Sequence, residues 1–179
     1  MSTAIPLLRV AARNAYVEYA NNPALNCHLA LAMAKLPVNK ESYEEFQPGA
    51  TNGSIEMATG AEACVVGINL KGIQPAILPL TSVPRGDRLK TTIYAAIVNE
   101  YAESETDREI PVIATAYGRL NAEMGELEGN MTTDYELRSI AKYSLVIGNT
   151  EVCRWNVQLG GWQAIGGQTG RINRMIGVI

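Results

Sequence analysis

Side chains that commonly carry out chemistry are sparse in this chain of 179 residues. Its single histidine, His28, lies on the polar side of a segment that alternates like a β-strand. No sequence motif places a serine or cysteine nucleophile beside it, and a catalytic histidine needs such a partner. A surface or cavity-lining role is therefore favoured for His28 over a catalytic one.

The three cysteines, Cys27, Cys64 and Cys153, each fall on the apolar side of an expected strand. An odd number fits no closed disulfide framework, and the spacing matches no zinc site. Unreactive buried thiols are favoured over reactive ones, with disulfides between chains as the alternative. This pattern is typical of a protein made in a reducing cytosol.

Two further patterns resemble ligand sites but lack the required spacing. The carboxylates form two clusters that match no calcium loop, so solvated surfaces are favoured over metal sites. The glycines of residues 160–170 contain no phosphate-binding GxxxxGKS or GxxxxGKT motif. We therefore expect no enzyme, and no metal or other cofactor. The clustered carboxylates are Glu41, Glu44, Glu45, Glu103, Glu105, Asp107 and Glu109.

Composition indicates one globular domain, residues 1–179. Hydrophobic residues make up 47% and charged residues 18% of the chain, as in ordinary soluble domains. The net charge of −3 argues against a surface that grips nucleic acid, because such a surface needs clustered lysine and arginine. No apolar run reaches the roughly 18 residues of a membrane span, so we expect no membrane anchor. The N-terminal residues lack the features of a signal peptide.

Period-two alternation of apolar and polar residues predicts a mainly β fold. The segment 74–80 contains Pro79 and is expected to form a short helix or an irregular apolar segment. With no βαβ rhythm and no repeat, a β-sandwich or barrel with at most one short helix is favoured. The expected strands are residues 13–19, 26–36, 62–70, 88–98, 110–124, 134–147 and 151–159.

The alternation also predicts which side of each strand faces the core. In the strand 26–36, Leu29 and Met33 are expected to point inward. The strands 110–124 and 134–147 form a long hairpin whose second face is polar but lightly charged. Such a face is compatible with a large assembly.

The polar segment 36–62 is too long for an ordinary connection between paired strands. It carries Tyr43 and the chain's only phenylalanine, Phe46, but has no core of its own. We expect it to pack on another surface, either of this chain or of another copy. The glycine-rich C-terminal segment 160–179 is likewise expected to dock, with Trp162 as its anchor.

The order of these features resembles the major tail tube proteins of contractile-tailed bacteriophages. In that family a strand ends in Leu-Pro, a charged loop with a tyrosine follows, and a Gly-x-x-Asn-Gly-Ser turn precedes a strand that ends near a glycine. A later strand carries a Gly-Arg pair, its hairpin partner carries a tyrosine, and the C-terminus is basic and then apolar. The matching residues are Leu36-Pro37, Lys40 to Tyr43, Gly49 to Ser54, Gly72, Gly118-Arg119, Tyr143, Gly170-Arg171, Arg174 and Ile176-Gly177.

This resemblance implies two packed antiparallel sheets with one short α-helix. It also implies a function, in which six copies form a ring and stacked rings form a hollow inner tube that conducts DNA from the capsid into the host cell. Four strands per subunit would line the lumen, and the loop 36–62 would reach the adjacent ring. By position these strands are 26–36, 62–70, 110–124 and 134–147.

The same resemblance implies partners and a location. The tail sheath protein would surround the tube, and the tape measure protein and then double-stranded DNA would fill its lumen. Baseplate and tail terminator proteins would bind its ends. The protein would assemble in the host cytoplasm and reside in the virion.

Three sets of residues are implied at the contacts of such a tube. The stacking-loop residues are Lys40, Glu41, Tyr43, Glu44, Phe46, Asn52 and Gly53. The lumen-facing candidates are Thr115, Tyr117, Arg119, Asn121, Glu123, Asp134, Glu136, Arg138 and Lys142. The C-terminal docking residues are Trp162, Arg171, Arg174 and Ile176.

Two alternatives remain at this point. The chain is also compatible with the inner tube of a tailocin or another contractile injection particle. A small β-sandwich binding module would use the region around Trp162 as a ligand platform, but aromatic residues are only 6% of the chain and are scattered.

Overall fold

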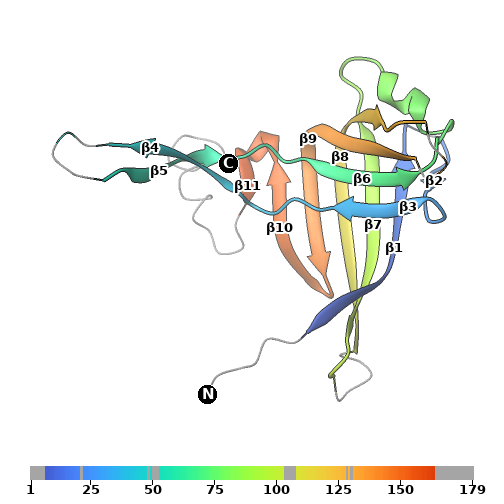
Figure 1. The fold of residues 1–179 in the computed structure, drawn as a ribbon, viewed down its shortest axis with the longest axis horizontal. Helices are drawn as coiled ribbons and strands as arrows, with labels where there is room; N and C mark the ends of the chain where they lie inside the picture. Colours follow the sequence, from blue (N-terminus) through green and yellow to red (C-terminus); the bar gives the residue numbers. More distant parts are fainter. Residues whose placement is uncertain are drawn as a thin grey trace.

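The computed structural model describes residues 7–20, 22–47, 49, 53–102, 108–127, 129 and 131–163. It confirms a mainly β fold with two antiparallel sheets, one of nine strands and one of two (Figure 1). The strands are β1 (Leu8–Glu18), β2 (Leu25–Asn26), β3 (Leu31–Lys35), β4 (Glu41–Phe46), β5 (Ile55–Ala61), β6 (Val66–Lys71), β7 (Leu89–Asn99), β8 (Glu109–Met124), β9 (Thr132–Ile147), β10 (Thr150–Asn156) and β11 (Gly161–Gln163). The 3-10 helices are η1 (Leu78–Ser82) and η2 (Val157–Leu159).

The nine-stranded sheet curls because β9 changes partners along its length. Residues 132–137 of β9 pair with β6, whereas residues 142–147 pair with β10. On its other edge β9 pairs with β8, and the sheet continues through β7 and β1 to β2. Residues 28–30 then lead from β2 into β3, which pairs with β6. The two ends of the layer therefore approach each other, and the body is barrel-like.

The core lies inside this curled sheet. Val66, Ile68 and Leu70 on β6 are almost fully buried, as their alternation predicts. They belong to one cluster with residues of β1, β3, β7, β8 and β9. These residues include Ala15, Val17, Leu31, Leu89, Ile93, Ala114, Leu120, Tyr135 and Leu137.

Gly118 on β8 and Ser139 on β9 mark the kink at which β9 exchanges β6 for β10. The β8–β9 register shifts between Tyr117 and Arg119, and Ser139 has a left-handed φ of 51°. A Cβ atom on Gly118 would lie 2.7 Å from the carbonyl oxygen of Arg138. Glycine is therefore required here, and the bulge bends both strands.

The expectation of one continuous strand over residues 26–36 is wrong. The amide of Leu31 donates to the carbonyl oxygen of Cys27 at 2.9 Å, so a turn separates β2 from β3. A register shift between Leu31 and Met33 then changes which residues face outward. Consequently Leu29 is 93% exposed and Met33 is 57% exposed, and neither packs inward as expected.

The short helix at residues 78–82 is a 3-10 helix, so the expected α-helix is wrong in type. Pro79 lies in its first turn and has no N–H group to extend an α-helical ladder. Before it, the amides of Ile77 and Leu78 both donate to the carbonyl oxygen of Gln74. The alternative expectation, an irregular apolar segment, describes this part better.

The segment 36–62 is not a structureless connection. Strands β4 and β5 form an antiparallel hairpin that projects from the body (Figure 1). Every residue of both strands is exposed. At its root the amide of Glu62 donates to the carbonyl oxygen of Lys40 at 2.8 Å. Residues 41–61 are called the arm below.

Candidate assembly surfaces

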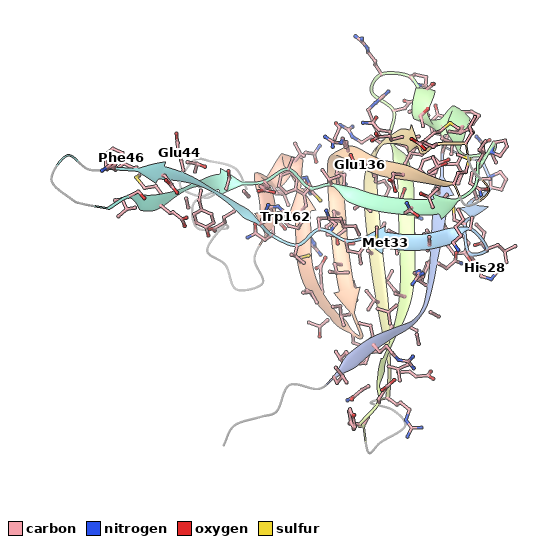
Figure 2. The ribbon with its side chains drawn as sticks, viewed as in Figure 1. His28, Met33, Glu44, Phe46, Glu136 and Trp162 are labelled. Atoms are coloured by element: carbon pink, nitrogen blue, oxygen red, sulfur yellow. The ribbon has the colours of Figure 1, made fainter. Side chains whose placement is uncertain are left out.

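Four neighbouring strands, in the order β3, β6, β9 and β8, present one polar surface, called here the four-strand face. They correspond to the four strands that the resemblance implies for a lumen. Backbone pairing aligns their outward residues in rows across the strands, and Figure 2 labels Met33 and Glu136 among them. One row is Lys35, Gly67, Glu136 and Asn121, and the next is Met33, Asn69, Asp134 and Glu123.

The nine lumen-facing candidates fall into three groups along β8 and β9. The first group lies on the four-strand face and consists of Asn121, Glu123, Asp134 and Glu136. The second group is Arg119 and Arg138, which lie opposite each other at the kink. The third group lies beyond the kink, where β7 and β10 flank β8 and β9, and consists of Thr115, Tyr117 and Lys142.

Charges of both signs are paired on the four-strand face. Arg138 forms an ion pair with Glu136 at an N–O distance of 2.6 Å. The side-chain amide of Asn69 donates a hydrogen bond to the carboxylate of Asp134. This surface is therefore neither strongly basic nor strongly acidic, and it offers no dense array of cations to a polyanion.

Both outer edges of the four-strand face lack a partner strand in the described part of the chain. On one side, β3 pairs only with β6. On the other side, β7 begins at Leu89 opposite Gly118, so residues 119–124 of β8 pair only with β9. Unpaired edges of this kind are templates for the addition of a strand from another chain.

The arm has two chemically different faces. Phe46 lies opposite Ile55, and the next pair on the same side of the hairpin is Glu44 opposite Met57. The side chains of Phe46, Ile55 and Met57 are each about half exposed. The other side carries Glu45 opposite Glu56. Figure 2 shows Phe46 and Glu44 near the far end of the arm.

Trp162 lies at the root of the arm. It is 5% exposed and packs edge-to-face on Trp155 and Tyr143, with ring centroids 5.4 and 5.9 Å away. Its indole Nε1 donates to the carbonyl oxygen of Glu62 at 3.4 Å. The expected ligand platform is therefore not available, because Trp162 is enclosed by its own chain. Lys40 also forms an ion pair with Glu62 at 2.7 Å.

The remaining expected site residues lie in turns or outside the part of the chain that the structure describes. Asn52, Arg171, Arg174 and Ile176 lie outside the described residues. Gly53 lies in the connection between β4 and β5. His28 lies in the turn before β3 rather than on a strand, and it is exposed (Figure 2).

The three cysteines are free thiols, two of them buried. Burial raises the pKa of Cys64 to about 12 and raises the pKa of Cys27 and Cys153. Such thiols are poor nucleophiles at neutral pH. The described ranges contain no group of three or more His, Cys, Asp or Glu residues able to hold a metal ion. Nor does any helix within them have the length and apolar character needed to cross a membrane.

A family model described as Phage tail tube protein FII matches residues 26–158. The chain belongs to this family. It is thus a structural subunit of a phage tail tube and a component of the virion, and tail tube proteins are not a class of enzyme. The matched range contains both the arm and the four-strand face.

Two solved structures contain chains with a similar outline. A chain of the anti-feeding prophage baseplate, solved by cryo-EM with sixfold symmetry, is 14% identical with a TM-score of 0.45, covering 84% of this chain and 99% of that one. A chain of the PVC sheath/tube terminator in its extended state is 10% identical with a TM-score of 0.41, covering 82% and 99%. No curated protein matches the sequence.

Sequence reasoning missed part of the tail tube protein's polar face. Lys35, Gly67 and Asn69 complete the rows begun by residues of β8 and β9. The signal was present, because Gly67 and Asn69 alternate with the buried residues of β6. The unpaired edge at residues 119–124 had no such signal, since it depends on where β7 begins.

Proposed function

We propose that the protein is the inner-tube subunit of a contractile tail. Six copies form a ring, and the rings stack into a hollow tube that conducts double-stranded DNA from the capsid into the host cell. Membership of the tail tube family supports the tube. The observation that carries the proposal is the pair of unpaired edges, β3 and residues 119–124 of β8, on either side of one polar face.

The strand directions allow one copy to continue the sheet of the next. The pairings β3–β6, β6–β9 and β9–β8 are all antiparallel, so β3 and β8 run in opposite directions. The β3 of a second copy can therefore add to residues 119–124 of β8 as another antiparallel strand. Because each copy uses two different edges, the contact is heterologous and forms a ring when the rotation closes.

The four-strand face would line the lumen of this ring. Its paired charges, such as Arg138 with Glu136, leave few free cations to displace counterions from DNA. DNA would pass over such a surface without being held. The tape measure protein would occupy the same lumen before DNA does, and this role requires no catalysis.

The arm would connect one ring to the next. It has no contact with a core of its own, and a two-stranded hairpin is marginally stable in water without further packing. Its apolar side, with Phe46, Ile55 and Met57, would be buried against a second copy. The sheath protein would pack outside the tube, baseplate and terminator proteins would cap its ends, and assembly would take place in the host cytoplasm.

Electron microscopy of the purified protein tests the tube, and cysteine cross-linking tests the edges. Uniform hollow tubes with sixfold rings are expected, whereas a protein that stays monomeric under all conditions would contradict the proposal. For the edges, Lys35 and Asn121 are replaced by cysteine in one chain. Oxidation of its tubes should give a ladder of covalent oligomers ending at the hexamer.

A matched pair of cysteines at Tyr94 and Val152 serves as the control for cross-linking. Both positions are exposed but lie away from the two edges. The control should give little ladder. An equal ladder from both pairs, or none from the edge pair in well-formed tubes, would reject ring closure through β3 and β8.

A further inference from the structure

Four arginines gather where the turn before β7 meets the kink of β8 and β9. Arg119 donates from its two Nη atoms to the carbonyl oxygens of Val83 and Pro84, at 2.8 and 2.7 Å. Arg88 of the same turn donates from Nε to the carbonyl oxygen of Ser139 at 3.5 Å. These contacts hold the turn beside the kink. Arg85 follows Pro84 in the same turn, and Arg138 lies opposite Arg119 on β9. These four residues, Arg85, Arg88, Arg119 and Arg138, are called here the arginine cluster.

The arginine cluster has more positive than negative charge. Arg119 and Arg138 lie directly opposite each other, and like charges so placed destabilise a strand pair. Glu136 pairs with Arg138, and Asp87 of the turn accepts a hydrogen bond from the Tyr19 hydroxyl at 2.7 Å. Arg138 is thus paired, whereas the printed hydrogen bonds of Arg88 and Arg119 go to uncharged backbone carbonyl oxygens. An external anion would stabilise the guanidinium groups of Arg88 and Arg119.

The arm has the opposite imbalance. Glu45 lies directly opposite Glu56, and Glu41 and Tyr43 lie on the same side, where the Tyr43 hydroxyl donates to Glu41 at 3.1 Å. This hydrogen bond, with the charges of Glu41 and Glu56, raises the pKa of Tyr43. Neither β4 nor β5 contains a lysine or arginine. We call this side, with Glu41, Glu45 and Glu56, the acidic face of the arm.

The arm and the arginine cluster cannot meet within one chain. In Figure 1 the arm points away from the body to the left, whereas the turn before β7 lies above the body. We infer that the acidic face of the arm of one copy binds the arginine cluster of a second copy. This inference rests on the proposed function, because it requires copies that assemble. Arginine forks and carboxylates form strong charge-assisted hydrogen bonds at such contacts.

Nucleic acid is the other polyanion that arginines bind, but it satisfies only half of the observations. Phosphates would balance the arginine cluster and leave Glu45 and Glu56 unmatched on the arm. In a contact between two copies, the glutamate pair Glu45 and Glu56 and the arginine pair Arg119 and Arg138 balance each other's charge. The contact is heterologous, so it can repeat along an open fibre such as a tube.

Charge reversal on each side tests the contact. The arm variant is Glu45→Arg with Glu56→Arg, the cluster variant is Arg85→Glu with Arg88→Glu, and the swap variant carries all four changes. The control, Glu109→Arg with Glu126→Arg, makes the same change in net charge as the arm variant at other exposed positions, and the swap variant keeps the net charge of the wild type. Tube formation is measured by sedimentation and electron microscopy, and folding of the monomer by circular dichroism.

We expect the arm and cluster variants to raise the concentration needed for tubes roughly tenfold or more, since like charges repel at the contact. The swap variant, and an equimolar mixture of the arm and cluster variants, should assemble much better than either variant alone. The control should assemble like the wild type. Wild-type assembly should weaken as salt rises, because exposed ion pairs are screened.

Three results would overturn the inference. One is a swap variant, or a mixture, that assembles no better than the single variants while the wild type forms normal tubes. Another is tube formation by the arm and cluster variants at the control's concentration. Both would leave the proposed function intact. If the wild type formed no tubes under any condition, the proposed function itself would fail, and the inference with it.

Discussion

The four-strand face and the arm are both exposed, but only one of them has a buried side. Beneath the four-strand face, residues such as Val66, Leu120 and Leu137 are at most 1% exposed and pack into the core. In the arm, neither side of the hairpin is buried. The single subunit therefore fixes the shape of the face, whereas the arm depends on a partner for most of its packing. Stability and assembly should be separable in this protein.

Removing the arm should have the largest effect. It should abolish tube assembly but leave folding of the monomer intact. Residues 41–61 are deleted, and Lys40 is joined to Glu62 through a short glycine linker, which is feasible because their backbones are hydrogen-bonded at 2.8 Å. The variant should fold as a monomer and form no stacked tubes by electron microscopy. Normal tubes from this variant would show that the arm is dispensable for assembly.

A cavity beneath the four-strand face should have the opposite effect. Leu137 is 0% exposed, so Leu137→Ala should lower the free energy of unfolding by about 2–5 kcal/mol, measured by urea denaturation of the monomer. Val152→Ala, at a position that is 41% exposed, is the control and should change it by less than about 0.5 kcal/mol. A similar loss in both variants would mean that the core does not support the face.

Alkaline pH should weaken the body through its buried thiols and phenols. The folded state keeps Cys64 protonated up to a pKa of about 12, whereas an unfolded thiol ionises near pH 8.5. The unfolded chain thus loses a proton that the folded chain retains, so stability is full below about pH 8.5 and falls as pH rises toward 12. Burial also raises the pKa of Tyr143, which adds to the fall. Urea titrations at increasing pH measure the slope, which should be smaller in Cys64→Ala; an unchanged slope would assign the effect to other groups.

Truncating Phe46 in the arm should have the smallest effect on stability. Phe46 is 51% exposed in the single chain, so Phe46→Ala should change the free energy of unfolding of the monomer by less than about 0.5 kcal/mol. Its effect should appear instead in the concentration at which tubes form. A loss of monomer stability comparable to that of Leu137→Ala would show that Phe46 packs within its own subunit and that the arm does not depend on a partner.

Period-two alternation of apolar and polar residues predicted most of the fold. It predicts the buried residues of β6, β7 and β8 because a strand with one buried face repeats every two residues. It failed at residues 26–36, where a turn and a bulge change the phase without a proline or glycine to signal them. It also missed the hairpin in residues 36–62, because β4 and β5 have no apolar side facing a core and so show no strong alternation.

The candidate surfaces were less accessible to sequence reasoning. The polar positions of β8 and β9 follow from alternation, but their alignment with β3 and β6 depends on the exchange of partners at Gly118 and Ser139. The arginine cluster brings together residues from a turn and from two strands that are as much as 53 positions apart (Arg85 to Arg138). Their proximity follows from the hydrogen bonds that the Arg88 and Arg119 side chains donate to backbone carbonyl oxygens, and from the pairing of Arg119 with Arg138.

Trp162 also bears on the order in which the protein is made. It anchors the arm's root by a hydrogen bond to Glu62, 100 positions earlier in the chain. Translation proceeds from the N-terminus, so a chain still on the ribosome has its arm before it has this anchor. An unfinished copy therefore presents an arm whose root is not yet fixed. If the arm connects rings as proposed, a chain would gain its fixed arm only after the whole matched family region, residues 26–158, has been synthesised.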